Sequence, residues 1–277
     1  MILASRLTRI ISHNNKTGAI VWVILSLMAL GGPTWWLWAW AALVLYQLLV
    51  MWIAPNVIMP LFNTFTPLQD EALKARVSAL MARSGFTAKG FFVMDGSRRS
   101  AHSNAFFTGF GASKRVVFFD TLLQQLDPGE MEAVLAHELG HFKHRHVPNM
   151  MLRSFALSLA GLALLGWLSG QVGFYTGLGV TPVLNDAHAN NALALILFML
   201  VLPLPLFFLT PLSSAWSRRQ EFQADAYAAQ HAQAQDLRSA LLKLYRDNAS
   251  TLTPDPVYVA FYYSHPPAGQ RLARLGV

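Results

Sequence analysis

The sequence contains no cysteine among its 277 residues. This absence excludes disulfide bonds and thiolate metal sites, so any metal ligands must come from histidine, aspartate or glutamate. A zinc site without cysteine is typical of catalytic zinc, because structural zinc sites are usually built from thiolates.

Charged residues are also scarce. They make up 13% of the chain, against about a quarter in a typical soluble domain. Hydrophobic residues make up 54%, and the mean hydropathy is +0.37. This composition predicts a membrane protein with a substantial water-facing part. The net charge is +7, but no dense run of Lys and Arg is present, which argues against nucleic acid as a partner.

Long apolar runs predict four transmembrane helices, at about residues 15–31, 34–53, 149–170 and 192–212. The second run has twenty residues without a charge, which is long enough to span the hydrocarbon core. We expect Pro55 and Pro60 to break the pattern after this run. Pro203 and Pro205 are expected to kink the fourth helix.

The distribution of basic residues predicts an orientation. The connections at residues 31–34 and 171–191 contain neither Lys nor Arg. With a cytoplasmic N-terminus, all 21 basic residues then fall on the cytoplasmic side or at its membrane border. The sequence therefore predicts a multi-pass integral membrane protein that presents its polar segments to the cytoplasm.

The polar segments have recognisable local patterns. Helices are expected at residues 69–84, 213–231, 236–247 and 270–275, with a loop at 251–256. Short β-rich runs at residues 91–94, 104–108 and 116–119 predict a small sheet with hairpin connections. Asp127 and Pro128 are typical of a helix N-terminus, and this helix is expected to run to about His146.

That helix carries the pattern His-Glu-x-x-His, at residues 137–141. Residues four apart lie on one face of a helix, so His137 and His141 can share one zinc ion. Glu138 lies beside them, where its carboxylate can take a proton from a zinc-bound water. His144 and His146 do not continue this face well, and we interpret them as interfacial residues, with alternative metal binding as the less favoured hypothesis.

A catalytic zinc needs a third protein ligand, which Glu221 and Asp225 can provide. They share a helix face, so one carboxylate can bind zinc while the other orients a ligating imidazole through a hydrogen bond. The alternative is an exposed acidic pair on a solvated helix. The presence of the His-Glu-x-x-His helix favours the metal site.

Three motifs in this order resemble the CAAX prenyl protease 1 family of integral-membrane zinc metalloproteases over about residues 60–277. They are His137–His141, Glu221–Asp225, and Ser264-His265-Pro266-Pro267 followed by Arg271, with a further similar segment that begins at Ser103-Asn104. HtpX-type membrane proteases share the first motif and looser forms of the others.

The resemblance implies roles for the matching positions. His137, His141 and Glu221 would hold one zinc ion per chain, with Glu138 as general base and Asp225 as the residue that orients a ligating histidine. His265 and Arg271 would stabilise the oxyanion or position the substrate backbone. Asn104 would lie on an edge strand that receives an extended peptide, by β-augmentation.

The expected fold is mainly α-helical and membrane-embedded. Its four transmembrane helices accompany an α+β, zincin-like catalytic domain with a small β-sheet. The expected division is an N-terminal transmembrane hairpin (1–57), a first catalytic part (58–147), a second hairpin (148–212) and a second catalytic part (213–277). Members of the prenyl protease branch usually have about seven membrane helices, so we expect a shortened N-terminal membrane region, closer to the HtpX-type plan.

The leading hypothesis is a membrane zinc endopeptidase that cleaves CAAX-type prenylated or membrane-associated peptides near the cytoplasmic face. Its expected partners are a peptide or protein substrate and the lipid bilayer. Two alternatives stay open: an HtpX-like quality-control protease, and a non-catalytic membrane scaffold. A metal transporter is disfavoured, because the candidate ligands lie outside the apolar runs, whereas transport sites lie at membrane depth.

Overall fold

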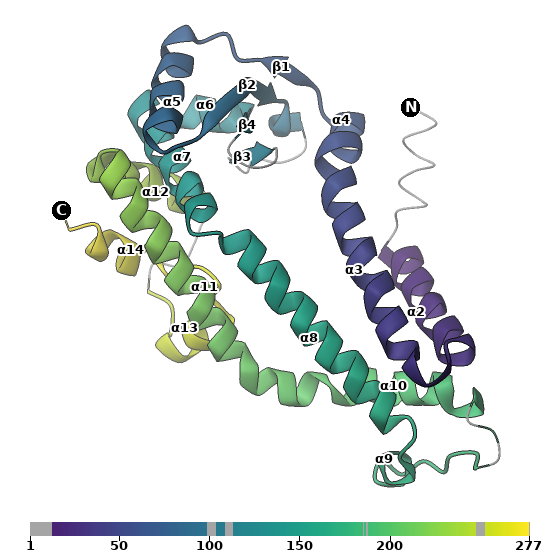
Figure 1. Cartoon of the computed structure of the whole chain (residues 1–277). Coiled ribbons are helices and arrows are strands. Elements are labelled where there is room, and N and C mark those ends of the chain that lie inside the picture. The colour runs from purple at the N-terminus through teal and green to yellow at the C-terminus, as the bar shows by residue number, and fades with distance from the viewer. Residues whose placement is uncertain are drawn as a thin grey trace. The chain divides into compact units, whose positions relative to one another are not determined.

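The structure is a computed structural model (Figure 1) that describes residues 13–98, 104–108, 113–184, 186, 188–247 and 253–276. The chain divides into two compact units. We call Met1–Phe62 with Asn149–Phe208 the helical unit, and Asn63–Pro148 with Leu209–Val277 the sheet unit.

Apolar helices make up the helical unit. They are α2 (His13–Leu30), α3 (Trp35–Ile53), most of α8 (His146–Leu168), α9 (Val172–Thr176), α10 (Asn191–Val201) and the start of α11 (Pro203–His231), with the 3-10 turns η1 (Gly32–Thr34) and η4 (His188–Asn190). Helix α2 packs on α3 and α10, and Trp40 Nε1 donates to the carbonyl of Phe155 over 2.9 Å. Many large apolar side chains on these helices are exposed, which suits a lipid environment rather than water.

The predicted count of four spanning helices is not confirmed. Among the described residues, two helices are long and apolar enough to cross a membrane, Gly32–Phe62 and His146–Leu168. A third span requires α10 and α11 to be counted together across a bend of 43°. The apolar part of α2 covers only Gly18–Leu30, which is shorter than the ~20 residues that span a bilayer.

The prolines act differently from one another. The helical path is not interrupted at Pro55, because α3 continues directly through a π-helical turn (η2, Ala54–Ile58) into α4 (Met59–Phe62). Such a turn changes the hydrogen-bond spacing and accommodates the missing N–H of proline. Pro203 separates α10 from α11, as expected. Helix α11 then continues through Pro211 to His231, so the prediction of two separate helices over this region was wrong.

The sheet unit contains a four-stranded sheet within the described residues, in the order β1-β2-β4-β3. The strands are β1 (Phe65–Pro67), β2 (Thr87–Met94), β3 (Ala105–Thr108) and β4 (Ser113–Phe119). Strands β3 and β4 pair antiparallel, as in the predicted hairpin, whereas β2 pairs with β4 in parallel. The expectation that hairpins join all the strands was therefore wrong, and β1 was not predicted.

Further helices lie wholly within the sheet unit. They are α5 (Glu71–Arg83), α6 (Asp120–Gln125), α7 (Pro128–Lys143), α12 (Ala234–Asp247), α13 (Pro256–Tyr262) and α14 (Ala268–Arg274), with the 3-10 turn η3 (Gly96–Arg98). Helix α5 contacts β2, and α7 contacts β3, α5 and α12. The buried core joins Leu80 of α5, Phe118 of β4, Leu139 of α7 and Leu237 of α12. Helix α7 therefore lies at the centre of the unit's packing.

The N-terminus of α7 is fixed by a capping box. The Asp127 side chain accepts from the backbone of Glu130, and the Asp127 N–H donates to the Glu130 carboxylate over 2.9 Å. That carboxylate is buried and also accepts from Ser239 and, over 2.6 Å, from Lys243, both on α12. Burial alone would raise the pKa of Glu130, but these hydrogen bonds hold it below its ordinary value of 4.5. One side chain thus caps α7 and joins it to α12.

We expect Glu130→Ala to lower the thermal unfolding midpoint of the detergent-solubilised protein by roughly 4–8 °C at pH 7, which corresponds to about 2 kcal/mol. Because the pKa is depressed in the folded state, this stabilisation is present above pH 4.5 and is lost as the pH falls further. The difference between the unfolding midpoints of the wild-type protein and of Glu130→Ala should therefore become smaller in acid. Glu71→Ala is the matched control, since Glu71 also lies in a first helical turn but its side chain is 82% exposed. Equal effects of the two substitutions would contradict the role of Glu130.

Candidate metal centre

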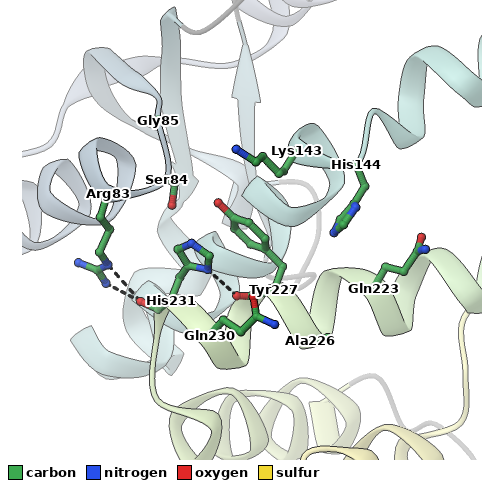
Figure 2. A pocket seen from close by; sticks show the side chains of 10 residues that line it. All are labelled: Arg83, Ser84, Gly85, Lys143, His144, Gln223, Ala226, Tyr227, Gln230 and His231. Atoms are coloured by element: carbon green, nitrogen blue, oxygen red, sulfur yellow. Dashed lines mark hydrogen bonds between the residues drawn. The ribbon is translucent and has the colours of Figure 1, made fainter.

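Two cavities of the sheet unit are lined by residues of α7 and α11. The larger, of about 580 Å³, is lined by Arg83, Lys143, Gln223, Tyr227 and neighbouring residues, and it contains none of the predicted site residues (Figure 2). The smaller, of about 480 Å³, is lined by seven of the eight predicted site residues: Asn104, His137, Glu138, His141, Glu221, His265 and Arg271. The remaining one, Asp225, is buried behind it.

Helix α7, which carries His137 and His141, approaches helix α11, which carries Glu221 and Asp225, closely at Gly140. A Cβ atom at this position would lie 3.0 Å from Ala224 Cα and 3.1 Å from Tyr227 Cβ. Because Ala224 is on α11 and is fully buried, a side chain at residue 140 would have to push the helix backbones apart. The glycine of His-Glu-Leu-Gly-His thus allows the histidines of α7 to meet the carboxylates of α11.

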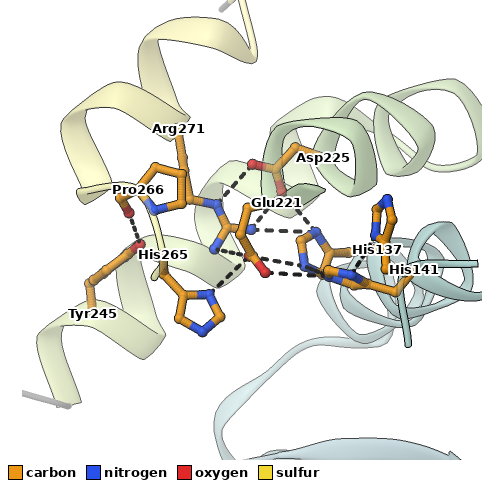
Figure 3. Close-up of polar contacts among 9 residues, drawn as sticks. His137, His141, Glu221, Asp225, Tyr245, His265, Pro266 and Arg271 are labelled. Carbon is orange, nitrogen blue, oxygen red and sulfur yellow. Dashed lines mark hydrogen bonds and ion pairs between the residues drawn. The ribbon is translucent and has the colours of Figure 1, made fainter. Parts of the chain in front are cut away.

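His137, His141 and Glu221 form one cluster, in which the potential ligand atoms all lie within 4.8 Å of one another (Figure 3). The two Nε2 atoms of His137 and His141 are 3.2 Å apart. Carboxylate oxygens of Glu221 lie 3.6 Å from His137 Nε2 and 3.5 Å from His141 Nε2. Ligands about 2.0–2.1 Å from a tetrahedral zinc ion are roughly 3.3–3.4 Å apart, so this donor set fits zinc.

Behind the cluster, Asp225 joins His137 to Arg271. His137 Nδ1 lies 2.8 Å from Asp225 Oδ1, and Arg271 donates to both oxygens of the same carboxylate over 2.8 and 2.6 Å. All three side chains are buried. Burial works to lower the pKa of His137, but hydrogen bonds to Asp225 and Glu221 raise it to about 9. A metal ion bound to His137 would displace this proton, because a ligating histidine is neutral.

Glu138 and His265 lie on the cleft side of the cluster. Burial raises the pKa of the Glu138 carboxyl, which brings it closer to the range suited to general-base catalysis. The side chain of His265 is 68% exposed, and its Nδ1 lies 3.1 Å from Glu221 Oε2. Both groups can therefore meet a molecule in the cleft.

The loop that carries His265 is anchored on both sides. Arg218 of α11 donates to the carbonyls of Val259 and Tyr263 over 2.9 and 2.8 Å. After the histidine, the hydroxyl of Tyr245 donates to the carbonyl of Pro266 over 3.0 Å (Figure 3). These contacts fix the position of His265 although its ring is exposed.

Asn104 directly precedes β3, the strand at one end of the sheet. Its carbonyl accepts from the N–H of Phe119 on β4 over 2.9 Å. Next to it, Phe106 and Phe107 of β3 line the cleft, together with Leu241 and Leu244 of α12. The cleft thus combines polar groups at the metal cluster with a largely apolar wall.

One residue at the cluster, His146, was missed by the sequence analysis. Helix α7 ends at Lys143 rather than at His146, and Arg145 has a positive φ of 54°. On a continuous helix His146 would point away from His141. Because Arg145 interrupts the helix instead, His146 Nδ1 lies 2.9 Å from His141 Nδ1. No local sequence signal marks this interruption, since glycine is the usual residue at such a position.

Comparisons with known proteins agree with this geometry. The family model described as peptidase family M48 matches residues 67–276, and the one described as CAAX prenyl protease N-terminal, five membrane helices, matches residues 15–64. The crystal structure of S. mikatae Ste24p superposes with a TM-score of 0.83 at 36% identity, over 100% of this chain and 65% of that chain.

Curated relatives show the same similarity. CAAX prenyl protease 1 of Saccharomyces cerevisiae is 39% identical over 254 residues, which is 88% of this chain and 56% of the yeast protein. The homologue of Arabidopsis thaliana is 40% identical over 267 residues, or 91% and 58% of the two chains. The chain therefore spans a little over half the length of these relatives.

The match to the N-terminal membrane helices and the apolar helices of the structure make the protein an integral membrane protein. The model of peptidase family M48 covers most of the chain, and the cluster of two histidines and a glutamate could hold the metal ion that this family implies. The chain belongs to peptidase family M48, as the resemblance to the CAAX prenyl proteases predicted.

Proposed function

We propose that this chain is a membrane zinc endopeptidase that hydrolyses peptide bonds of prenylated CAAX-type substrates. The observation that carries the proposal is the spacing of His137, His141 and Glu221, which fits one zinc ion, in a cleft that also exposes Glu138. The relatives that bear the name CAAX prenyl protease 1 support the substrate class.

His137 and His141 would bind the ion through Nε2, and Glu221 would bind it through its carboxylate. A bound zinc ion would supply a Lewis acid that polarises the substrate carbonyl and lowers the pKa of a bound water molecule to near neutral. Asp225 would accept the Nδ1 proton of His137 and so fix the orientation of that ring. Since Arg271 is buried against Asp225, we assign it to positioning this carboxylate rather than to contact with the substrate.

Glu138 would accept a proton from the attacking water as the oxygen bonds to the carbonyl carbon. The same carboxyl would then give this proton to the amine nitrogen as the C–N bond breaks. The ring of His265, which is exposed in the cleft, would donate a hydrogen bond to the negative charge that develops on the carbonyl oxygen.

The substrate peptide would add as an extended strand along β3, beginning near Asn104. The apolar wall that includes Phe106 and Leu244 would accommodate apolar side chains or a prenyl group. We further propose that residues 58–147 and 213–277 form the catalytic domain and that the chain crosses the membrane four times. The absence of Lys and Arg from residues 171–191 supports a catalytic domain on the cytoplasmic side.

Substitution of the proposed base tests the reaction. Glu138→Gln should reduce cleavage of a farnesylated CAAX peptide by about 10²–10⁴-fold while the zinc content stays at one ion per chain. Removal of zinc with a chelator should abolish cleavage, and added zinc should restore it. Glu71→Gln is the control, because that side chain is exposed and remote from the cleft.

Three outcomes of this assay would be decisive. Unchanged cleavage by Glu138→Gln at intact zinc content would refute the assignment of the base. Equal cleavage of the farnesylated peptide and its unprenylated form would refute the substrate class and favour a general membrane protease. Zinc binding without turnover of any peptide would favour a scaffold.

The close approach of the two helices also predicts how metal binding responds to packing. Gly140→Ala should weaken zinc binding by about tenfold, roughly 1.4 kcal/mol, because the added methyl group displaces Glu221 on α11 from the histidines. Gly269→Ala is the matched control, since Gly269 is also helical but has no atom within 4 Å of the position that an added methyl group would occupy. A chelator competition assay measures both affinities. Equal affinities in the two variants would show that the helix spacing does not set the ligand geometry.

A further inference from the structure

The two histidines of the cluster are held in different ways. His137 is paired with the carboxylate of Asp225, whereas the Nδ1 atom of His141 faces Nδ1 of another histidine, His146, over 2.9 Å. The other ring nitrogen of His146, Nε2, lies 3.0 Å from Oε1 of Gln223 on α11. His146 is only 5% exposed, so water has little access to replace either contact.

The positions of the protons in this chain of hydrogen bonds follow from its chemistry. If His141 binds the metal through Nε2, the atom that faces His137 and Glu221, then its Nδ1 carries the proton and donates. His146 Nδ1 must then accept. A neutral His146 has its remaining proton on Nε2, which faces Gln223 Oε1, an atom that can only accept. The N–H groups of the two imidazole rings that lie in this chain, those of His141 Nδ1 and His146 Nε2, therefore each meet an acceptor.

We propose that His146 and Gln223 are positioning residues that fix the tautomer and the ring orientation of the metal ligand His141. The inference rests on the metal site of the proposed function and extends it to two residues to which the recognised motifs assign no role. Gln223 lies between Glu221 and Asp225 on α11, and it also lines the larger cavity (Figure 2). Helix α11 thus supplies the metal ligand Glu221, the carboxylate of Asp225 that orients His137, and the amide of Gln223 that ends the chain of hydrogen bonds from His141.

The backbone supports this assignment. The N–H of His144 donates to the carbonyl of Gly140, and the N–H of Arg145 donates to the carbonyl of Phe142. The end of α7 is therefore hydrogen-bonded regularly up to Arg145. The left-handed conformation of Arg145 is uncommon for a residue with a side chain and needs support from the surrounding structure. The contacts of His146 with both His141 and Gln223 provide that support.

Two substitutions at residue 146 separate the hydrogen bond from simple packing. The amide of asparagine occupies about the position of Nδ1 of histidine, and that of glutamine about the position of Nε2. His146→Asn keeps an acceptor for His141, whereas His146→Gln keeps only a donor for Gln223. Both variants remove the ring. We expect zinc affinity to fall by about 10–100-fold in His146→Gln and by less than about threefold in His146→Asn.

The measurement is the apparent zinc dissociation constant of the full chain in detergent, from chelator competition, together with the unfolding midpoint of the zinc-free protein. Gln223→Leu should weaken zinc binding, and Gln223→Glu, which keeps an acceptor oxygen, should restore most of it. His144→Ala is the control, because His144 stacks on His146 but is exposed and lies outside the chain of hydrogen bonds.

Equal losses of zinc affinity in the two residue-146 variants would overturn the proposal, because they would reveal a role in packing alone. A larger loss in His146→Asn than in His146→Gln would overturn it as well. The readout does not need turnover. Tight zinc binding without peptide cleavage would refute the proposed function. The inference about His146 would then be decided by the zinc affinities of the variants alone. A wild-type chain that binds no zinc would refute both.

Discussion

The contact between Gly140 of α7 and Ala224 of α11 is the constraint on which the metal cluster depends. Two histidines on one helix offer a cation only two ligands, and the third group is about 80 residues away in the sequence. Glycine within a helix costs about 1 kcal/mol relative to alanine, so its presence there needs a compensating gain. The gain is a helix spacing at which Glu221 meets both imidazoles and Asp225 reaches His137 from behind.

Burial makes this arrangement demanding. Glu221, Asp225, Arg271 and His137 are all withdrawn from water, and unpaired charges there would cost several kcal/mol each. Asp225 is compensated by Arg271 through two hydrogen bonds. Glu221 has contacts with His137, His141 and His265, and it forms a longer ion pair, of 3.7 Å, with Arg271 Nη1. Metal binding would release the proton that His137 otherwise holds. With neutral imidazoles, Glu221, Asp225 and Arg271 together carry one net negative charge at the point where the metal would bind.

The sequence predicts well what local periodicity determines. The i, i+4 spacing places His137 with His141, and Glu221 with Asp225, on common helix faces whatever the rest of the fold. Asp127 and Pro128 likewise mark the start of α7. The pairing of strands that are distant in the sequence is harder to predict. The parallel register of β2 with β4 depends on contacts that no local pattern encodes, and β1 has only three residues.

Helix ends show the same limit. An arginine with positive φ ends α7 where glycine would have been the recognisable signal, and this misplaced His146 in the sequence analysis. The converse error occurs in α11. The change from apolar to polar composition near residue 212 predicted a helix end there, but the helix continues to His231. In both places tertiary contacts override the local preference, and one of these places lies at the candidate site.

His137 is oriented by the carboxylate of Asp225, whereas His141 is oriented by another imidazole, and this difference affects the net charge of the site. Glu221 and Asp225 carry two negative charges against the one positive charge of Arg271, so a divalent cation brings this group of residues and metal to a net charge of +1. A carboxylate behind His141 in place of the neutral His146 would reduce that charge to zero and weaken the polarisation of a substrate carbonyl. A cation at that position would oppose the metal itself. A neutral chain of hydrogen bonds that ends on the amide of Gln223 avoids both effects, because it orients the second imidazole without altering the charge of the centre.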